Sequence, residues 1–342
     1  MVTSIREEAF SPCIAYTGTR PVEYAAVPLT MYGSGADHLE AYTSMSALLE
    51  HFYAEKNTLT RIRQKSSDLR RIVQTALERD IKKYAPQLAQ MKDTEKREKY
   101  RIYGELLNTY GYSAKPGDRS LTTVNYYTNE PVTIPLDPTL SATENAKKYF
   151  DKYGKLKRTY EALSELTCQV KEEIDHLETI SAALDIALKE EDLVEIKEEL
   201  TQSGYIRRKG GTKKAKITSR PFHYLSSDGF HIYVGKNNFQ NDELTFKFAT
   251  GNDWWFHAKG IPGSHVVVKT EGKELPDRTF EEAGRLAAYY SKGREQEKVE
   301  IDYVQKKQVK KPAGAKPGFV VYYTNYSLMI DSDISGIEKI SD

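Results

Sequence analysis

Residues 252–269 contain the residue types best suited to a binding site, including both tryptophans of the chain and two of its histidines. Residues 254–258 form a short aromatic run, residues 261–263 read Ile-Pro-Gly, and residues 265–269 are rich in valine. A β-branched or aromatic run on either side of a Pro-Gly corner predicts two strands joined by a stiff turn.

Side chains alternate along the first of these strands, so Trp254 and Phe256 share one face while Asp253, Trp255 and His257 share the other. We expect the first face to be core and the second to be a polar, aromatic, solvent-facing site. The same pattern is also consistent with a Trp255 that packs at a sheet edge and a His257 that is a satisfied surface histidine.

Polar loops at residues 235–241, 257–265 and 306–316 could converge beside this strand. Lysines, amides and exposed backbone donors next to an aromatic ring suit the phosphates, 2′-hydroxyls and unstacked bases of a folded RNA. The alternatives are an ordinary hairpin exit at residues 235–236 and a solvated lysine face. The candidate nucleic-acid contacts are Lys236, Asn237, Asn238, Asn241, Asp253, Trp255, His257, Lys259, Ser264, His265, Lys292, Lys310, Lys311 and Lys316.

A second basic stretch, residues 207–220, contains no acidic residue. Gly210 and Gly211 keep it from continuing a helix, so we interpret it as a mobile hinge. It is either a solvated linker or an electrostatic contact to nucleic-acid phosphates. Its candidate contacts are Arg207, Arg208, Lys209, Lys213, Lys214 and Lys216.

Catalysis has no comparable sequence signal. No phosphate-binding loop, nucleophile elbow or paired-carboxylate pattern is present, and the histidines have no neighbouring nucleophile. Cys13 and Cys168 are far apart, which argues against a disulfide framework or a cysteine-rich metal site. We expect no enzyme activity, no cofactor and no metal, and we expect Cys168 to be a buried thiol beside a helix seam.

The chain has 342 residues, of which 39% are hydrophobic and 29% are charged. This length suits about two or three domains, and this composition favours long solvated helices over one thick core. No apolar run approaches the ~20 residues that span a bilayer, and the first residues lack a signal-peptide core. We therefore expect a soluble, cytoplasmic protein without a membrane partner.

Residues 1–43 are irregular and strand-like, as expected for the remnant of a domain whose main body is absent. From Ser44 the apolar residues follow a heptad seam that shifts register near residue 77, which predicts one long helix with a stutter. Pro86 removes a backbone donor, so a kink or break is expected there. A shorter helix is expected at residues 94–110.

Residues 111–140 predict a small β-containing head, with strands at residues 121–127 and 131–136. Ser141 and Glu144 form a capping-box pattern for a second long helix, whose seam runs from Tyr149 to Leu188. Two such helices joined through the head predict an antiparallel coiled-coil arm over residues 44–206, roughly 75 Å long at 1.5 Å per residue.

The last part, residues 221–342, predicts a compact domain. Strands are expected at residues 224–226, 230–234, 299–304, 318–323 and 326–330 in addition to the tryptophan-rich pair. Asn241 or Asp242 could cap a short helix, and Thr279 with Glu282 could cap a second that ends near Gly293. The expected fold class is α+β, with two helices against a mostly antiparallel sheet.

Several long motifs resemble the NFACT family, in the same order along nearly the whole chain. The C-terminal motifs are residues 235–242, 255–257, 261–267, 310–312 and 314–320, and the motifs of the middle part are residues 52–53, 55–56, 64–70, 98–107 and 134–138. The first group is similar to the RNA-binding C-terminal domain of that family, and the second is similar to the coiled coil and head of its bacterial members.

The resemblance implies a ribosome-associated quality-control factor. Such proteins bind tRNA and the rRNA of large ribosomal subunits obstructed by peptidyl-tRNA, reach a stalk-base protein with the coiled coil, and support template-free alanine tailing of the stalled chain. The chain departs from the family because the N-terminal NFACT domain and helix-hairpin-helix are absent, apart from a strand region from Ser11 onward. A fragment of this kind could bind RNA without supporting tailing.

Two other functions remain open at this point. The family's older description as fibronectin-binding protein A suggests a surface adhesin with fibronectin as its partner. A hydrolytic or nucleotide-modifying activity would have to use His257 or His265. Our expectation is a non-enzymatic RNA- and ribosome-binding protein.

Overall fold

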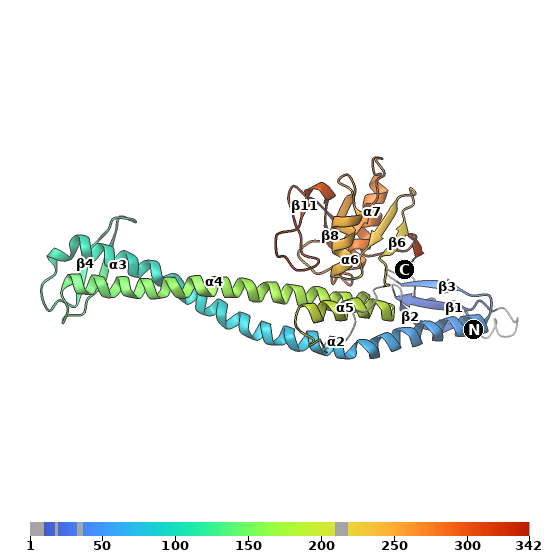
Figure 1. Cartoon of the computed structure of the whole chain (residues 1–342), viewed down its shortest axis with the longest axis horizontal. Helices are drawn as coiled ribbons and strands as arrows, with labels where there is room; N and C mark the ends of the chain where they lie inside the picture. The colour runs from blue at the N-terminus through green and yellow to red at the C-terminus, as the bar shows by residue number, and fades with distance from the viewer. Residues whose placement is uncertain (1–9, 18–19, 33–36, 209–217, 342) are drawn as a thin grey trace. The chain divides into compact units, whose positions relative to one another are not determined.

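The computed structural model describes residues 10–17, 20–32, 37–208 and 218–341 (Figure 1). The chain forms two compact units: residues 1–76 with 175–342, and residues 77–174. Two long helices, α2 (Met45–Asp93) and α4 (Ala142–Ile186), contribute to both units. Within the described residues, no helix is long and apolar enough to cross a membrane.

The N-terminal residues of the first unit form a small antiparallel sheet. Its strands are β1 (Cys13–Thr17), β2 (Arg20–Ala25) and β3 (Asp37–Ala41), in the order β2-β1-β3. Ile14 and Tyr16 of β1 pack against Leu48 and Phe52 of α2. Because so small a sheet cannot enclose a core by itself, the start of α2 supplies the other half of this one.

Helices α2 and α4 pack antiparallel in each unit. In the first unit, the Arg70 guanidinium lies 2.5 Å from the Asp185 carboxylate. In the second, the Thr167 hydroxyl of α4 lies 3.9 Å from the Met91 sulfur of α2. Helix α3 (Arg97–Tyr110) also packs on α4, since the Arg97 guanidinium lies 3.8 Å from the ring centroid of Tyr160, and the rings of Tyr103 and Tyr149 meet edge to face at 5.3 Å. Every position of the predicted α4 seam is buried or partly buried. The prediction of paired antiparallel helices is confirmed.

Helix α2 is not broken at Pro86, which lies on an exposed face where water can satisfy the carbonyl left without a partner. Two other local predictions about these helices are wrong. After the stutter, Ile81 is 51% exposed and its neighbour Asp80 is buried, so the seam is one residue out of register there. Cys168 is exposed because it follows the buried Thr167, about 100° further around the helix.

The second unit ends in the head predicted between the two long helices. A 3-10 turn, η1 (Thr94–Lys96), leads into α3 (Arg97–Tyr110) and η2 (Gly111–Ser113). Strands β4 (Ser120–Asn125) and β5 (Glu130–Pro135) then form an antiparallel hairpin. Leu121 and Ile134 of this hairpin pack with Leu106 of α3, so the head has a core of its own.

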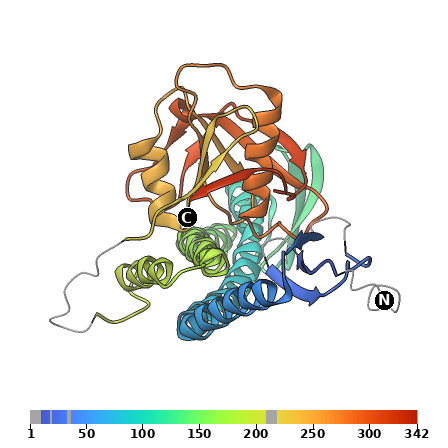
Figure 2. The same ribbon diagram turned by 90° about the vertical axis from the view of Figure 1, so that its right-hand side faces the viewer.

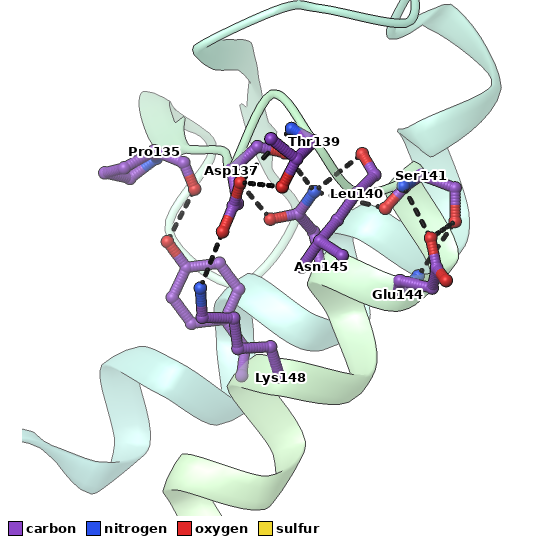
Figure 3. A network of polar contacts seen from close by, with 9 residues as sticks. Pro135, Asp137, Thr139, Leu140, Ser141, Glu144, Asn145 and Lys148 are labelled. Atoms are coloured by element: carbon purple, nitrogen blue, oxygen red, sulfur yellow. Dashed lines mark hydrogen bonds and ion pairs between the residues drawn. The ribbon is translucent and has the colours of Figure 1, made fainter.

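A polar network fixes the head to the first turn of α4 (Figure 3). The Ser141 hydroxyl accepts from the Glu144 backbone N–H at 3.2 Å, and Glu144 accepts from the Ser141 N–H at 2.8 Å. The predicted capping box is therefore present. Buried Asn145 bridges the Asp137 N–H and the carbonyls of Leu140 and Ser141, so the turn before α4 is held from both sides.

Helix α5 (Glu190–Gln202) follows a break after Ile186 that the heptad pattern does not predict. The C-terminal domain of the first unit is built on an antiparallel seven-stranded sheet in the order β13-β10-β8-β9-β7-β6-β14. Its strands are β6 (Phe222–Leu225), β7 (His231–Val234), β8 (Trp254–Ala258), β9 (Val266–Val268), β10 (Val299–Gln305), β13 (Tyr326–Ile330) and β14 (Glu338–Ser341). A separate ladder pairs β11 (Val309–Lys310) with β12 (Val321–Tyr322), and η4 (Lys306–Gln308) precedes it.

Both faces of the seven-stranded sheet are covered (Figure 2). Helix α7 (Asp277–Tyr289) packs Ala283 and Leu286 against Phe256 on one face. Helix α6 (Asn238–Glu243) continues into the π-helical turn η3 (Leu244–Phe248), and Leu244 packs on Trp255 on the other face. The expected α+β class, with two helices against an antiparallel sheet, is confirmed.

The predicted caps of these two helices are wrong. Asn237 caps α6, since its side chain accepts from the Gln240 N–H at 3.0 Å. Helix α7 begins at Asp277, and Thr279 lies inside its first turn. The Thr279 hydroxyl instead donates to Asp228 at 2.8 Å, so this polar pattern ties the helix to the turn between β6 and β7.

Candidate nucleic-acid interface

Most of the candidate contacts near the tryptophans are interior residues. Trp255 is fully buried, because η3 and β12 cover the face of β8 that was expected to meet solvent. The prediction of an exposed Trp255 is wrong, although the division of side chains between the two faces is correct. The buried candidates are Lys236, Asn237, Asn238, Asn241, Asp253, Trp255, Ser264 and His265.

Trp255 and His265 are buried, and His257 is partly buried beside them. The Trp255 ring centroid lies 5.7 Å from that of His257 and 5.0 Å from that of His265. Burial lowers the pKa of His257 to about 4, and burial together with His257 holds the pKa of His265 well below its usual value. Both imidazoles are therefore neutral at pH 7 and offer no charge to a phosphate. Within the described part of the chain, Trp255 Nε1 and the Ser264 hydroxyl have no hydrogen-bond partner.

The amide-rich candidates around α6 bind helix α5 instead of facing solvent. The Lys236 ammonium lies 3.3 Å from the Asp192 carboxylate, and both side chains are at most 2% exposed. Asn237 and Gln240 each donate to Glu195 at 2.6 Å.

One turn further along α5, Asn238 donates to Glu199 at 2.8 Å. Three carboxylates on one side of α5 thus occupy the donors that were predicted to bind RNA. We call this contact the α5 joint; it consists of Asp192, Glu195, Glu199, Lys236, Asn237, Asn238 and Gln240.

Burial dominates the electrostatics of the α5 joint. It raises the pKa of Glu199 to about 8, against the smaller opposing effects of the Asn238 amide and Lys316. Burial also raises the pKa of Glu195, whose hydrogen bonds to Asn237 and Gln240 act in the opposite direction. Glu199 is therefore mostly protonated at pH 7, which explains how a carboxyl with so little compensating charge is tolerated in the interior.

The Asp253 carboxylate connects the loop before β8 to the turn after β9. It accepts from the backbone N–H groups of Thr250 at 2.7 Å and Thr270 at 3.0 Å, and from the Lys269 ammonium at 2.5 Å. These bonds lower the pKa of Asp253 although burial opposes them. A buried, ionised carboxylate with this many donors holds the start of β8 and the turn after β9 in place.

The exposed cations and aromatic rings gather on the segment around β11 and β12, residues 306–323, which we call the basic hairpin. Lys307 and Lys310 are exposed, and Phe319 and Tyr323 are 51% and 63% exposed. Because Lys310 pairs with Val321 across the ladder, the lysine strand and the aromatic strand lie side by side. Cations for phosphates and exposed aromatic rings for bases are thus present in one segment.

Asp242 fastens the basic hairpin to the domain. Its carboxylate contacts the Lys311 ammonium and accepts from the Gly318 N–H at 3.1 Å. Gly318 has φ +78°, and a Cβ there would lie 2.4 Å from Oδ1 of Asn238. Only glycine fits this turn, so the hairpin is held tightly beside α6, and Lys311 is partly committed to the fold.

The remaining candidates are dispersed. Exposed Lys259 pairs with Glu300 at 2.6 Å, Lys292 is exposed, and Lys316 is partly buried. Arg207 and Arg208 are exposed, and Arg208 pairs with Glu198. Lys209, Lys213, Lys214 and Lys216 lie outside the described residues. Of the predicted set, Lys310, Lys311 and Lys316 belong to the basic hairpin, and Lys310 and Lys311 are exposed there.

The candidate loop predicted at residues 306–316 includes Lys307 but not the aromatic residues that follow it. Phe319 and Tyr323 belong to the exposed surface, and the spacing of lysines and aromatics on either side of a Gly-Ala-Lys-Pro-Gly turn was the available signal. Asp192, Glu195 and Glu199 recur every three or four residues, which places them on one face of a helix. An acidic helix face ordinarily indicates solvent exposure, so this pattern did not reveal a buried joint.

The chain matches protein families over most of its length. Residues 1–219 match the NFACT N-terminal and middle domains, and residues 220–323 match the NFACT protein RNA binding domain. The basic hairpin thus lies in the part that matches the RNA binding domain. Among the described residues, no group of histidine, cysteine, aspartate and glutamate side chains could hold a metal ion.

Curated relatives cover nearly the whole chain. The Rqc2 homolog RqcH of Streptococcus suis is 40% identical over 308 residues, which are 90% of this chain and 55% of that protein. The Rqc2 homolog RqcH of Bacillus subtilis is 34% identical over 345 residues, which are 99% of this chain and 59% of that protein. This chain therefore spans less than two thirds of the length of these relatives.

A solved structure is also similar. It is the C-terminal part of the fibronectin/fibrinogen-binding protein of Streptococcus suis, with 35% sequence identity and a TM-score of 0.65, and the match covers 82% of this chain and 100% of that chain. The order of motifs, the fold and the extent of these matches agree, and the chain belongs to the NFACT family.

Proposed function

We propose that this chain binds RNA in ribosome-associated quality control, and that binding rather than catalysis is its function. The observation that carries the proposal is the basic hairpin, which carries exposed Lys307 and Lys310 together with exposed Phe319 and Tyr323 within the part that matches an RNA binding domain. The relatives named Rqc2 homologues favour the same setting.

The partners we propose are tRNA and the rRNA of large ribosomal subunits obstructed by peptidyl-tRNA, with a stalk-base protein contacted by the paired helices. In that setting the chain supports template-free alanine tailing of the stalled nascent chain in the cytoplasm. Its part is to hold RNA, because lysines engage phosphates without reference to base sequence while the free rings stack on unpaired bases.

Sedimentation with purified ribosomal particles tests this function. The full chain is mixed with large subunits that carry peptidyl-tRNA, with empty large subunits, and with small subunits. We expect preferential binding to the obstructed large subunits, and a clear loss when Lys307 and Lys310 are both changed to Ala. Lys298→Ala, at an exposed lysine outside the hairpin, is compared with each single variant, Lys307→Ala and Lys310→Ala, and controls for the loss of one charge. Equal binding to all particles, or none, would refute the proposal.

A second candidate is fibronectin binding, favoured by the name of the similar solved protein. The same purified chain is titrated with fibronectin and, separately, with tRNA. Our proposal predicts that the chain binds tRNA more tightly than it binds fibronectin, and that its binding of tRNA does not require fibronectin. Tighter binding to fibronectin, insensitive to Lys307→Ala and Lys310→Ala, would favour this second function.

A further inference from the structure

A polar hollow of about 470 Å³ opens beside Trp254, on the α7 side of the sheet. We call it the tryptophan pocket; its walls include Asn252, Trp254, Lys273, Asp277, Phe280 and Gln305. This volume falls within the range of about 300–1,000 Å³ that is typical of sites for small organic ligands. Nothing in the α5 joint or the basic hairpin accounts for this hollow.

Two aromatic rings form the apolar part of the pocket. The Trp254 and Phe280 ring centroids lie 4.9 Å apart and their planes meet at 78°, which fixes the indole edge to face. Both side chains are only partly buried. The Tyr303 ring centroid lies 5.8 Å from that of Trp254, so the pocket offers an indole that is held by its neighbours and leaves part of its surface for contact with a planar ring.

The loops around these rings are preformed. The buried Asp253 carboxylate ties the loop before β8 to Thr270, and the Thr270 carbonyl accepts from the Lys273 N–H at 2.9 Å. The turn between them carries Glu271 at φ 51° and Gly272 at φ 82°, so it is a tight, defined turn. A pocket that is organised before binding loses less entropy when a ligand enters.

The polar groups at the rim select the class of ligand. Asn252 and Gln305 are amides, which can both donate and accept hydrogen bonds, as the edges of nucleobases do. Glu274 and Asp277 bring two carboxylates to the same rim and Lys273 brings one ammonium group, so the negative charge that repels a phosphate is in excess. An aromatic wall with amide edges and an acidic rim therefore fits an uncharged, planar, hydrogen-bonding ring.

The position of the pocket links it to the basic hairpin. Gln305, at the end of β10, is followed directly by η4, whose Lys306 N–H donates to the Asp253 carbonyl at 2.8 Å. The Lys307 N–H donates to the Gly251 carbonyl at 3.1 Å. The first lysines of the hairpin are therefore joined by backbone bonds to the loop that lines the pocket.

We propose that the tryptophan pocket binds a single unstacked nucleobase of an RNA whose phosphates lie on the lysines of the basic hairpin. The inference rests on the proposed RNA binding and adds a base-binding site to it. The base stacks on Trp254, and its hydrogen-bonding edge meets Asn252 and Gln305, as enzymes and RNA-binding domains hold everted bases.

The first test uses free nucleosides and the full chain. Adenosine, guanosine, cytidine and uridine are titrated while the two indole N–H signals are followed by NMR. We expect nucleosides to shift the Trp254 signal and to leave that of Trp255 in place, because Trp255 is buried on the other face of the sheet. Ribose alone should shift neither. An unmoved Trp254 signal, or an equal response to ribose, would overturn the base pocket.

The second test uses the double variant Asn252→Ala, Gln305→Ala, whose side chains are exposed or partly exposed, so folding is retained. Loss of two hydrogen bonds should weaken single-stranded RNA binding about tenfold. The salt dependence should not change, since no charge is removed. RNA of the same sequence with abasic positions should bind wild type and variant equally. An equal loss on abasic RNA would show that the amides do not read a base.

These outcomes separate the inference from the proposed function. If nucleosides bind at Trp254 but no RNA binds, the proposed function fails, and the pocket is a nucleoside site without the RNA role proposed for it. If RNA binds through the hairpin while nucleosides and the double variant have no effect, the pocket is refuted and the function stands.

Discussion

Trp254 and Trp255 are neighbours with different environments. Trp255 is fully buried among Leu244, Val267 and Val304, whereas Trp254 is partly exposed at the tryptophan pocket. We predict that Trp255→Ala lowers the free energy of unfolding by about 3–5 kcal/mol, because it leaves a large cavity. The affinity of the folded fraction for RNA should stay close to that of wild type.

Urea unfolding and RNA titration of the same samples measure both effects. Tyr112→Ala serves as the control, since Tyr112 is 87% exposed and its loss should cost no more than about 0.5 kcal/mol. A Trp255→Ala protein that keeps wild-type stability but loses RNA affinity would return Trp255 to the surface role first expected from the sequence.

His257 predicts an unusual titration. Its pKa of about 4 lies below the usual 6.5, so the folded protein keeps this imidazole neutral while the unfolded chain would protonate it. Its contribution to stability is therefore present above pH 6.5 and is lost as the pH falls toward 4. In an NMR titration the ring should not change protonation between about pH 5 and 8. A midpoint near the usual value would contradict the burial described here.

The division of the β8 side chains between the two faces of the sheet was correctly predicted, whereas the solvent exposure of the face with Trp255 was not. Period-two alternation determines that Trp255 and His257 share a face, because it is a property of the extended backbone. Whether that face meets water depends on how η3, just before the strand, and β12, distant in sequence, fold over it. A local pattern cannot report such covering, so the polar character of His257 and His265 was mistaken for solvent exposure.

At the level of elements, the α5 joint predicts a pH-dependent stability. The pKa of Glu199 is raised to about 8, so the folded state binds a proton that the unfolded state releases near pH 4.5. The stability from this group is fully present below pH 4.5 and is lost as the pH rises through 8. Glu199→Gln keeps an oxygen acceptor for Asn238 and should remove this dependence.

Urea unfolding of wild type and Glu199→Gln across this pH range measures the effect. The free energy of unfolding of the variant, relative to that of wild type, should increase with pH and reach on the order of a few kcal/mol at the alkaline end. Subtracting the two curves cancels the other titrating groups. A constant difference would show that Glu199 is ionised throughout and that the joint tolerates its charge.

The helix seam makes a separate prediction. Leu177 is fully buried in α4, so Leu177→Asp should place an unpaired charge in the interior and destabilise the first unit by several kcal/mol. Cys168→Asp, on an exposed face of the same helix, should cost no more than about 0.5 kcal/mol. Measurements of helicity and of resistance to limited proteolysis compare the two variants. Equal behaviour of the two variants would refute buried pairing at Leu177.

Elements with a strong period or a complete local signature were predictable. The α4 seam and the Ser141–Glu144 capping box needed only helical spacing and adjacent side chains. The break before α5 and the roles of Thr279 and Glu282 were not predictable, because their partners come from other elements. Thr279 bonds Asp228 and Glu282 bonds Ser227, across more than fifty positions of sequence.

For the molecule as a whole, family and fold class could be predicted from the sequence, and the binding surface could be predicted only in part. Ordered motifs such as residues 235–242 are sufficient for family membership, which the comparisons confirm. The same motif was expected to bind RNA, yet its donors face Asp192, Glu195 and Glu199 in the α5 joint. Motif identity does not reveal which partner a side chain faces.

The central claim is that the basic hairpin binds RNA phosphates, and the salt dependence of RNA affinity tests it most directly. The full chain, Lys307→Ala with Lys310→Ala, and the control Lys298→Ala are titrated with tRNA at several salt concentrations. The choice of Lys307 and Lys310 leaves the Lys311 contact to Asp242 intact.

Our account predicts that the hairpin variant binds tRNA more weakly than wild type. The slope of log affinity against log salt concentration should be shallower by about one to two units, because fewer phosphate contacts form and fewer counterions are released on binding. The Lys298→Ala slope should match wild type. A hairpin variant with the wild-type slope and affinity would contradict the account.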